Sequence, residues 1–292
     1  MRVLLTGEQG FTAQYVVPLL EAAGIDIAPL GVDLTDREAV LARVAAVAPT
    51  HVLHLAGISF VPHGTDARVY AVNTVGTLNV LHALSSLPQP PQRVVLASSS
   101  HVYGGREGLL VETVPLMPRT HYGASKLAME YLARVRGEGL DIIITRPFNY
   151  TGRGQREHFL VPKLVAAFAR RDQELHLGNI DVARDFSDVR HVAQGYMRLL
   201  TEPHAYGVYN MCAGKPLCVR DILDGLARIT GHSPAIVTDP ALVRAHEVRA
   251  QWGDGARMKS LQPEAQPAFE ETLRWMLESC SISVSKHEHN LV

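Results

Sequence analysis

The start of the chain combines an apolar run with a glycine turn, and this combination restricts the fold more than any other feature. Residues 2–6 read R-V-L-L-T, typical of a short buried strand, and residues 7–13 read G-E-Q-G-F-T-A before a helix expected at 16–23. A turn between a strand and a helix lets the backbone approach a pyrophosphate and points free N–H groups at it. Ala13 is small enough for the helix–strand contact at the third position. The pattern predicts a dinucleotide-binding turn at Gly7 and Gly10, although a single match also suits an ordinary tight turn.

The preference between NAD and NADP stays open. An acid that binds the ribose 2′-hydroxyl usually follows about 20 residues after the glycines, and an arginine nearby usually serves a 2′-phosphate. Neither is evident at the end of the second expected strand, 25–30.

Apolar runs alternate with amphipathic segments through most of the chain. Strands are expected at 2–6, 25–30, 51–57, 93–97, 141–149, 174–177 and 207–211, and helices at 16–23, 37–48, 69–84, 122–136, 158–171, 188–200, 219–230 and 268–278. The alternation predicts an α/β fold, a doubly wound parallel Rossmann sheet with a smaller C-terminal substrate-binding α/β lobe. We expect a dinucleotide-binding domain at 1–150 with a return segment at about 184–211, a substrate lobe at 151–183 and 212–280, and a tail at 281–292.

Composition argues against several partners. The formal net charge is −1 and no basic run exceeds Arg170-Arg171, so nucleic acid is not expected as a partner. No stretch approaches ~18 consecutive apolar residues and the apolar start is too short for a signal peptide, so no membrane partner is expected either. Cys212, Cys218 and Cys280 are odd in number and lack zinc-ligand spacing. They are expected to be reduced, buried thiols of a cytoplasmic protein.

Histidine spacing does not predict a metal site, and no metal is expected. His51 and His54 are three apart on an expected strand and therefore point to opposite faces, as packed or hydrogen-bonded side chains. His287 and His289 lie in the polar last stretch of the chain, which is expected to be a mobile end.

The segment Y-G-A-S-K at 122–126 is the strongest candidate for chemistry. On a helix, the spacing of four places Tyr122 and Lys126 on one face, a turn apart. A free phenol titrates near ~10, and a nearby ammonium lowers that pKa, which makes the phenol useful for proton transfer. Alone, this pair could be a chance pair on a helix surface. Ser99 strengthens it, because hydroxyls follow the apolar run 93–97 at the edge where open α/β sheets bind ligands.

Together, the glycine turn, Ser99, Tyr122 and Lys126 resemble the extended short-chain dehydrogenase/reductase (NAD-dependent epimerase/dehydratase) family, in its sugar-nucleotide branch. The resemblance covers roughly residues 1–277. Four segments are similar to those of GDP-mannose 4,6-dehydratases and their partner reductases: R-P-F-N at 146–149 with G-R-G-Q at 152–155, L-G-N-I-D at 177–181, R-D-F at 184–186, and R-A-H-E-V at 244–248 with G-D at 253–254.

The resemblance implies a role for each matching residue. Tyr122 would be the acid/base, Lys126 would lower its pKa and hold the nicotinamide ribose, and Ser99 would bind the reacting sugar oxygen. The implied NAD(P)H-binding residues are Gly7, Gly10, Phe11, Thr12, Asp33, Leu34, Leu55, Ala56, Gly57, Asn73, Ala97, Tyr122, Lys126 and Pro147. The implied residues for a nucleotide diphosphate sugar are Ser59, Ser100, His101, Asn149, Phe159, Lys163, Asn179, Arg184, Arg244 and Glu247.

One departure bears on the reaction. Dehydratases of this branch carry a Glu two residues after the catalytic Ser/Thr, and the related epimerase-reductases carry a Cys, whereas this chain has His101. The loss of water across C5 and C6 needs an ionised base over C5. The resemblance therefore implies reduction of GDP-4-keto-6-deoxy-D-mannose to GDP-D-rhamnose or GDP-6-deoxy-D-talose. A nucleotide-sugar 4-epimerase, a 4,6-dehydratase and a non-catalytic dinucleotide sensor are the alternatives.

The resemblance also implies a homodimer. Family members pair through the two helices expected here at 66–87 and 122–136. The second helix offers more apolar surface than one sheet contact requires, from Ala124, Leu127, Ala128, Tyr131, Leu132 and Val135. Packing against the subunit's own sheet remains the other explanation for that surface.

Overall fold

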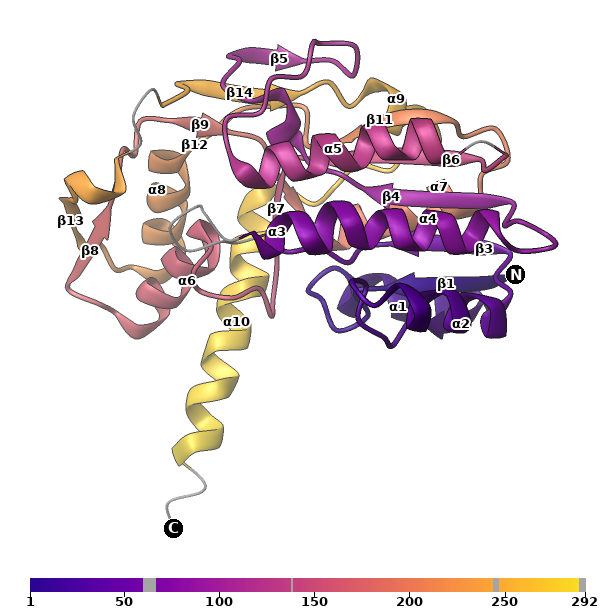
Figure 1. The fold of residues 1–292 in the computed structure, drawn as a ribbon. Helices are drawn as coiled ribbons and strands as arrows, with labels where there is room; N and C mark the ends of the chain where they lie inside the picture. The colour runs from indigo at the N-terminus through magenta and orange to yellow at the C-terminus, as the bar shows by residue number, and fades with distance from the viewer. Residues whose placement is uncertain (60–66, 138, 244–246, 289–292) are drawn as a thin grey trace.

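A computed structural model describes residues 1–59, 67–137, 139–243 and 247–288 (Figure 1). Its central element is a six-stranded sheet in the order β11-β6-β4-β3-β1-β2. All of its pairings are parallel. The strands are β1 (Arg2–Thr6), β2 (Asp26–Pro29), β3 (His51–His54), β4 (Arg93–Ala97), β6 (Ile142–Pro147) and β11 (Gly207–Met211). The order runs outwards in both directions from β1 and β3, as in a doubly wound sheet, so the predicted fold class is confirmed.

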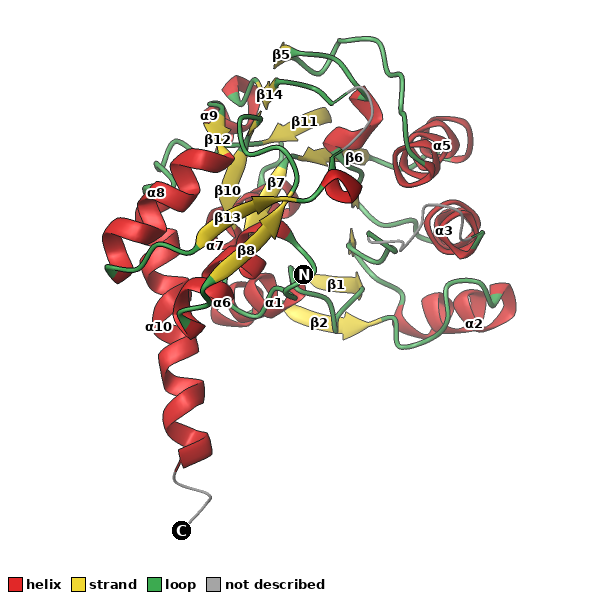
Figure 2. Ribbon diagram, turned by 90° about the vertical axis from the view of Figure 1, so that its left-hand side faces the viewer, coloured by secondary structure: helices red, strands yellow, loops and turns green. Residues whose placement is uncertain are grey.

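Helices cover both faces of this sheet, which is why most residues of its inner strands are buried and apolar. One face packs on α1 (Ala13–Ala22) and α7 (Val189–Thr201) around a core that includes Val16, Leu20 and Leu199. The other face packs on α2 (Arg37–Val47), α4 (Thr77–Ser85) and α5 (His121–Arg136) around Val44, Leu81 and other buried residues. Figure 2 shows α5, α3 (Arg68–Tyr70) and α2 side by side on this second face.

A second group of helices surrounds its own apolar cluster. It consists of α6 (Leu160–Arg170), α8 (Val219–Thr230) and the first half of α10 (Phe269–Glu288), with the strand pair β8 (Glu174–Leu177) and β13 (Ala235–Thr238) beside them. Leu164, Leu226 and Leu273 are among the buried residues of this cluster. The end of α10 projects beyond the rest of the molecule (Figure 1).

Short strands connect the large sheet to this second group. A four-stranded sheet has the order β12-β9-β14-β5, formed by Leu217–Cys218, Ala183–Arg184, Ala250–Gly253 and Gly108–Leu110. A separate pair joins β7 (Asn149–Thr151) to β10 (Phe186–Asp188). The remaining elements are α9 (Ala256–Leu261) and two 3-10 turns, Ser100–Tyr103 and Pro240–Leu242.

The structure differs from the sequence prediction in several places; the strand expected at 51–57, for example, ends at His54. The helix expected at 69–84 contains a π-helical segment, Ala71–Gly76, between α3 and α4. The strand expected at 141–149 ends at Pro147, and the chain starts a different strand at Asn149. Residues 281–288 continue α10 instead of forming an irregular tail, since no proline or glycine interrupts the helix after Phe269. His289 lies outside the described residues.

Candidate active site

Helix α5 carries Tyr122 and Lys126 to the carboxyl edge of the sheet. The helix begins after Thr120, whose Oγ1 accepts a hydrogen bond from Gly123 N (3.0 Å) and so satisfies one of the unpaired N–H groups of the first turn. Lys126 is buried, and its Nζ donates to Ala97 O at the end of β4 (2.8 Å). This contact anchors the first turns of α5 to the strand that leads into the serines.

Ser99 and Tyr122 meet at this edge, as the resemblance implies. Ser99 follows β4, is buried, and forms a side-chain hydrogen bond with Tyr122. Its Oγ also accepts from His101 N (3.2 Å), which fixes the start of the 3-10 turn Ser100–Tyr103. The His101 ring lies edge-on to the Tyr122 ring, with centroids 5.3 Å apart. A hydroxyl, a phenol and an imidazole therefore border the same space.

Tyr122 keeps its proton in this environment. Burial raises the pKa of its phenol to about 12, although the hydrogen bond with Ser99 acts in the opposite direction. The sequence led us to expect a pKa lowered by Lys126, and the direction is the reverse. The ammonium of Lys126 donates to Ala97 O, while desolvation of the phenolate dominates. At neutral pH Tyr122 is therefore protonated.

Lys126 is buried as well, but burial shifts the pKa of a cationic group in the opposite direction. Burial lowers its pKa to about 8, and the carboxylate of Glu130 on the same helix opposes that shift. Close to neutral pH the side chain is mostly an ammonium, beside the space that Ser99 and Tyr122 border.

The glycine turn has the geometry of a dinucleotide cradle. Gly7 has φ +74°, and a Cβ there would lie 2.8 Å from Ala56 N and 3.0 Å from Leu55 C. Gly10 N donates to Gly7 O (2.8 Å), and a Cβ on Gly10 would lie 2.9 Å from that same oxygen. Only glycine fits both positions, and α1 begins three residues later. The backbone is thus open to a pyrophosphate at a helix N-terminus.

A second close approach joins more of the residues that were assigned to the cofactor. A Cβ on Gly57 would lie 3.0 Å from Asn73 Oδ1 and 3.0 Å from Lys126 Nζ. Asn73 is fully buried in the π-helical segment, where its Nδ2 donates to Ile58 O (3.1 Å) and to Ser125 Oγ (3.1 Å). The loop after β3, the π-helical segment and α5 are thereby held together, and the residues present fit a dinucleotide.

The other cofactor candidates differ in how far they are buried and in what they contact. Thr12 Oγ1 shares a hydrogen bond with the Tyr150 hydroxyl (2.8 Å), and Phe11 stacks on the Tyr150 ring (6.0 Å between centroids). Asp33 is exposed in the loop after β2, where Thr35 N and Oγ1 both donate to its Oδ1 at 2.8 Å. Leu34 lies buried against Gly76, while Ala97 and Pro147 end β4 and β6.

Tyr150 has contacts that the sequence did not reveal. It belongs to β7, yet its ring and hydroxyl reach Phe11 and Thr12 of the glycine turn. It therefore connects the short strands to the turn. A tyrosine directly after an R-P-F-N segment was the only available signal.

The substrate candidates are distributed over the short strands and the second helix group. Asn149 Nδ2 donates to Asp185 O (3.0 Å), and Lys163 Nζ on α6 donates to His176 O (2.8 Å). Arg184 Nη1 donates to Ala183 O (2.8 Å), and Asn179 Oδ1 accepts from Asp181 N (2.9 Å). The Arg184 and Asn179 contacts are made to residues within two positions of them in the chain, whereas the Asn149 bond joins β7 to the residue between β9 and β10. None of these four hydrogen bonds joins two of the candidates.

Further candidates differ in exposure. Ser100 is buried in the 3-10 turn, Ser59 and His101 are exposed, and Phe159 is half-buried before α6. Glu247 Oε2 is buried without a hydrogen-bond partner among the described residues. Arg244 lies outside the described residues.

Histidines and cysteines of the described chain form no metal centre. No three His, Cys, Asp or Glu side chains within those ranges could hold one ion. His54 is buried and bonded to Thr6 Oγ1 (2.8 Å) and Thr77 Oγ1 (2.9 Å), and His51 Nδ1 bonds Thr50 Oγ1 (3.0 Å). Both histidines are hydrogen-bonded, as the sequence predicts.

The cysteines and the longer helices give two further findings. All three cysteines are free, and each is half-buried, less covered than the buried thiols expected from the sequence. Of the helices in the described ranges, none has the length and apolarity that crossing a bilayer requires.

Comparison with known proteins agrees with this geometry. Residues 3–212 match the model of the NAD dependent epimerase/dehydratase family. The chain is 36% identical over 274 residues to a GDP-6-deoxy-D-mannose reductase of Pseudomonas aeruginosa, covering 88% of this chain and 89% of that one. It is 32% identical over 265 residues to a GDP-6-deoxy-D-talose 4-dehydrogenase of Aggregatibacter actinomycetemcomitans, covering 88% and 90%.

A solved structure extends the similarity to three dimensions. The structure of the protein named RMD from Pseudomonas aeruginosa, complexed with NADPH, superposes with a TM-score of 0.86 at 31% identity, covering 96% of this chain and 98% of that one. The resemblance inferred from the sequence is confirmed: the chain belongs to the NAD dependent epimerase/dehydratase family, the NAD(P)-dependent enzymes of the extended short-chain dehydrogenase/reductase type.

Proposed function

We propose that this protein reduces the 4-keto group of GDP-4-keto-6-deoxy-D-mannose with NAD(P)H, forming GDP-D-rhamnose or GDP-6-deoxy-D-talose. The observation that carries the proposal is the meeting of Ser99 and a protonated Tyr122 at the end of β4, with Lys126 one turn away. The two relatives named above support the substrate class, because both names refer to GDP-6-deoxyhexoses.

The reaction adds a hydride to C4 and a proton to the C4 oxygen. The nicotinamide cofactor supplies the hydride when it is bound. Tyr122 holds the proton that the oxygen needs, since its pKa of about 12 keeps the phenol protonated at neutral pH. The Ser99 hydroxyl donates to the same oxygen and stabilises its developing charge. The ammonium of Lys126 then stabilises the phenolate that the proton transfer leaves behind.

The cofactor and the sugar nucleotide bind to different parts of the chain in this proposal. We assign cofactor binding to residues 1–150 with the return segment at about 184–211, and sugar-nucleotide binding to 151–183 and 212–280. Arg184 and Arg244 suit a diphosphate, because guanidinium groups bind its oxygens with paired donors. The unpartnered Glu247 Oε2 can accept hydrogen bonds from sugar hydroxyls. Ser59, Ser100, His101, Asn149, Phe159, Lys163 and Asn179 complete the proposed set.

A turnover assay tests the reductase. The purified protein is mixed with GDP-4-keto-6-deoxy-D-mannose and either NADPH or NADH, and the products are identified by NMR. The proposal expects oxidation of the cofactor with formation of one C4 alcohol. The coupling constants of H4 then decide between the rhamno and talo products, and the two rates decide the cofactor preference. No consumption of either cofactor would refute the reductase.

A nucleotide-sugar 4-epimerase is the second candidate, supported by the match to a family model that includes epimerases. Such an enzyme oxidises and re-reduces C4 on one retained cofactor. Resident NAD in the purified protein, seen by its absorbance, together with C4 inversion without added cofactor, would favour the epimerase. A 4,6-dehydratase is less well supported, because His101 stands where an acidic base is required.

The guanine nucleotide gives a prediction about binding. A pocket shaped for a purine leaves a void around a pyrimidine, so we expect GDP to bind more tightly than dTDP by at least ~1.4 kcal/mol, about tenfold. Calorimetry with both nucleotides measures the difference. The Arg184→Gln variant is the control, because losing a diphosphate contact should weaken both nucleotides to a similar extent. Equal affinities, or tighter dTDP, would point to a thymidine-linked 4-keto sugar instead.

We also propose a homodimer in the cytoplasm. Three free cysteines are consistent with a reducing compartment. Side chains on the outer surface of α5 and of the π-helical segment support the dimer: Val135 is 70% exposed, Tyr131 54% and Val75 48%. Helices that pair through this surface would bury these residues, as in a four-helix bundle.

The dimer can be tested by adding charge to this surface. Replacing both Tyr131 and Val135 with Glu should convert a dimer into the 31.9-kDa monomer, because charges in an apolar interface are costly to bury. Sedimentation at micromolar concentration distinguishes the two. Leu242→Glu is the matched control, an exposed leucine outside α5 whose replacement should leave assembly unchanged. A wild-type protein that sediments only as a monomer contradicts the dimer.

A further inference from the structure

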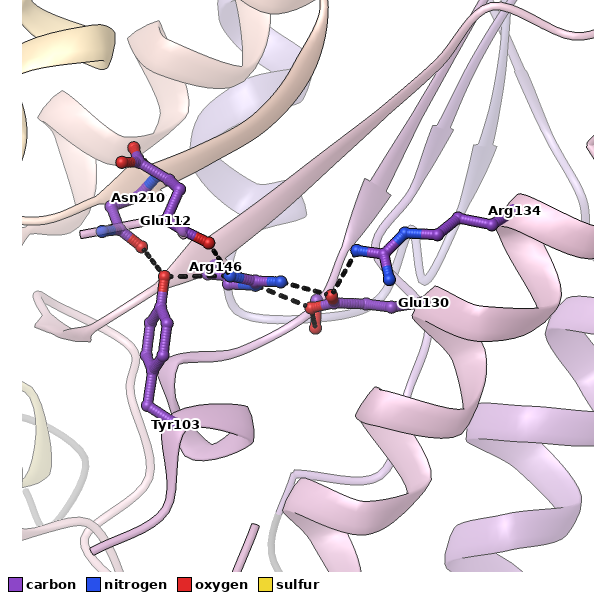
Figure 3. A network of polar contacts seen from close by, with 7 residues as sticks. Tyr103, Glu112, Glu130, Arg134, Arg146 and Asn210 are labelled. Atoms are coloured by element: carbon purple, nitrogen blue, oxygen red, sulfur yellow. Dashed lines mark hydrogen bonds and ion pairs between the residues drawn. The ribbon is translucent and has the colours of Figure 1, made fainter. Parts of the chain in front are cut away.

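A buried ion pair lies directly behind the proposed active site. Glu130 follows Lys126 by one helical turn and Tyr122 by two, so all three lie on one face of α5. Its carboxylate accepts two hydrogen bonds from Arg146 of β6, one from Nη2 (2.7 Å) and one from Nε (2.9 Å). Both side chains are inaccessible, with 0% of Glu130 and 2% of Arg146 exposed (Figure 3).

The carboxylate also reaches the strand that carries the serines. Ser98 Oγ donates to Glu130 Oε1 (2.6 Å), and Ser98 is the residue before Ser99. The residue before Ser98 is Ala97, whose carbonyl accepts from Lys126 Nζ (2.8 Å). Two hydrogen bonds therefore set the position of α5 relative to the end of β4. Ser98 of the strand end donates to Glu130 of the helix, and Lys126 of the helix donates to Ala97 of the strand.

Arg146 extends the same connection to the turn after Ser99. Its Nη1 donates to the Tyr103 hydroxyl (3.1 Å) and to Glu112 O (2.8 Å), and its guanidinium lies over the Tyr103 ring, 5.0 Å from the centroid. The Tyr103 hydroxyl donates in turn to Asn210 Oδ1 on β11 (2.7 Å). Figure 3 shows this row of contacts running from α5 to β11. Tyr103 ends the 3-10 turn that carries His101.

We propose that the Glu130–Arg146 pair positions the catalytic groups: it fixes Tyr122 and Lys126 relative to Ser99 and keeps a negative charge beside the Lys126 ammonium. Neither residue contacts the space that Ser99 and Tyr122 border, so both act through others. The kinetic part of the proposal rests on the proposed reductase function. The proposed effect of Glu130 on the pKa of Lys126 does not depend on that function.

The charges around Lys126 give the direction of the electrostatic effect. On its own helix, Glu130 favours the ammonium and raises the pKa of Lys126, although burial is the larger effect and lowers the pKa to about 8. From β3, His54 stays neutral, since burial and Lys126 lower its pKa to about 3. From β6, Arg146 is positive and pairs with Glu130. Arg134, one turn further along α5 and half-exposed, also pairs with Glu130 (3.7 Å; Figure 3). Removing the Glu130 charge therefore lowers the pKa of Lys126, and the ammonium is lost at lower pH.

A buried ion pair could instead serve stability alone, so the test needs a matched pair remote from the site. Arg93 of β4 and Asp141, next to β6, form a partly buried ion pair at the amino edge of the same two strands (3.0 Å, with 8% of the Arg93 and 42% of the Asp141 side chain exposed). Asp141→Asn breaks it and leaves the carboxyl edge untouched. A loss of stability common to Glu130→Gln and Asp141→Asn is therefore separable from an effect on chemistry.

The experiment compares Glu130→Gln, Ser98→Ala and Asp141→Asn with the parent protein at a temperature where circular dichroism shows each to be folded. We expect Glu130→Gln to lower kcat by ~10–100-fold, since small misplacements of reacting groups cost rate in this range. KM should change far less, and the alkaline limb of the pH profile should move to lower pH. Ser98→Ala should lower kcat in the same direction, and Asp141→Asn should not change kcat.

A second measurement does not depend on the substrate. The chain has five lysines, at 126, 163, 215, 259 and 286, so the signal of Lys126 can be followed by NMR with ¹³C-labelled lysine and assigned with Lys126→Met. The Lys126 pKa should be about 8 in the parent, lower in Glu130→Gln and unchanged in Asp141→Asn. An unchanged Lys126 pKa in Glu130→Gln would overturn the electrostatic part, even if the protein reduces no GDP-sugar.

The kinetic arm has its own contradicting result. If Glu130→Gln and Ser98→Ala keep the parent kcat and pH profile, or if Asp141→Asn lowers kcat as much as they do, the pair is structural and the proposal fails. Should Glu130→Gln not fold, Ser98→Ala decides the kinetic arm, because it removes one hydroxyl and leaves the ion pair intact.

Discussion

Replacing Tyr122 with phenylalanine should lower kcat by ~10²–10⁴-fold, the usual cost of losing a general acid or base. The variant keeps the ring and its edge-on contact with His101, and loses only the hydroxyl that bonds Ser99 and holds the transferable proton. Cofactor affinity, measured by fluorescence titration, and the melting temperature should be nearly unchanged. Steady-state kinetics on the 4-keto sugar measures the loss.

Tyr206→Phe is the matched control for this substitution. Tyr206 is 70% exposed, and its ring lies against Arg257. Its ring contact involves neither Ser99 nor Lys126. Its hydroxyl has no part in the proposed chemistry, so kcat should remain that of the parent. Full kcat in Tyr122→Phe would mean that another group supplies the proton.

Replacing Gly7 with alanine should weaken NAD(P)H binding by at least tenfold. The left-handed backbone at φ +74° costs an alanine about 1–2 kcal/mol of stability, whether or not the cofactor is bound. The new Cβ would also lie 2.8 Å from Ala56 N, so the turn or the loop after β3 has to move. A loss of 1.4 kcal/mol already corresponds to about tenfold in affinity. Fluorescence titration with NADPH and NADH measures the change.

Gly24→Ala separates the backbone strain from the cradle. Gly24 has φ +69°, close to that of Gly7, but a Cβ there would meet nothing within 4 Å, and the residue lies between α1 and β2. The variant should lose some stability and bind the cofactor as the parent does. If Gly7→Ala binds the cofactor normally, the turn does not hold the pyrophosphate.

The main sheet could be predicted from sequence because its strands are buried on both faces. The apolar runs at 2–6 and 93–97 coincide with β1 and β4 from end to end. The π-helical segment left no such signal, since its residues continue the helical pattern of their neighbours. Strands such as β9 and β12 are two residues long and exist because distant loops meet. Their pairing depends on tertiary contacts that no local pattern contains.

The proposed catalytic residues were easier to predict than their electrostatics. Tyr122, Lys126 and Ser99 followed from spacing and from the resemblance, but the direction of the Tyr122 pKa did not, because burial outweighs the nearby cation. Glu130 and Arg146 were missed as a pair. Two signals existed: an acid at the next position of the catalytic helix face, and a charged residue within the apolar run of β6. Neither signal identifies the partner without the fold.

Transfer of deuterium tests the central claim most directly. The protein is supplied with GDP-4-keto-6-deoxy-D-mannose and NAD(P)D labelled at the transferable C4 position of the nicotinamide, and the sugar product is examined by NMR. A 4-keto reductase should place one deuterium at C4 of the 6-deoxyhexose for each cofactor oxidised, and Tyr122→Phe should slow this transfer by ~10²–10⁴-fold. A C4 alcohol without deuterium, or an unconsumed cofactor with an unchanged keto sugar, would contradict it.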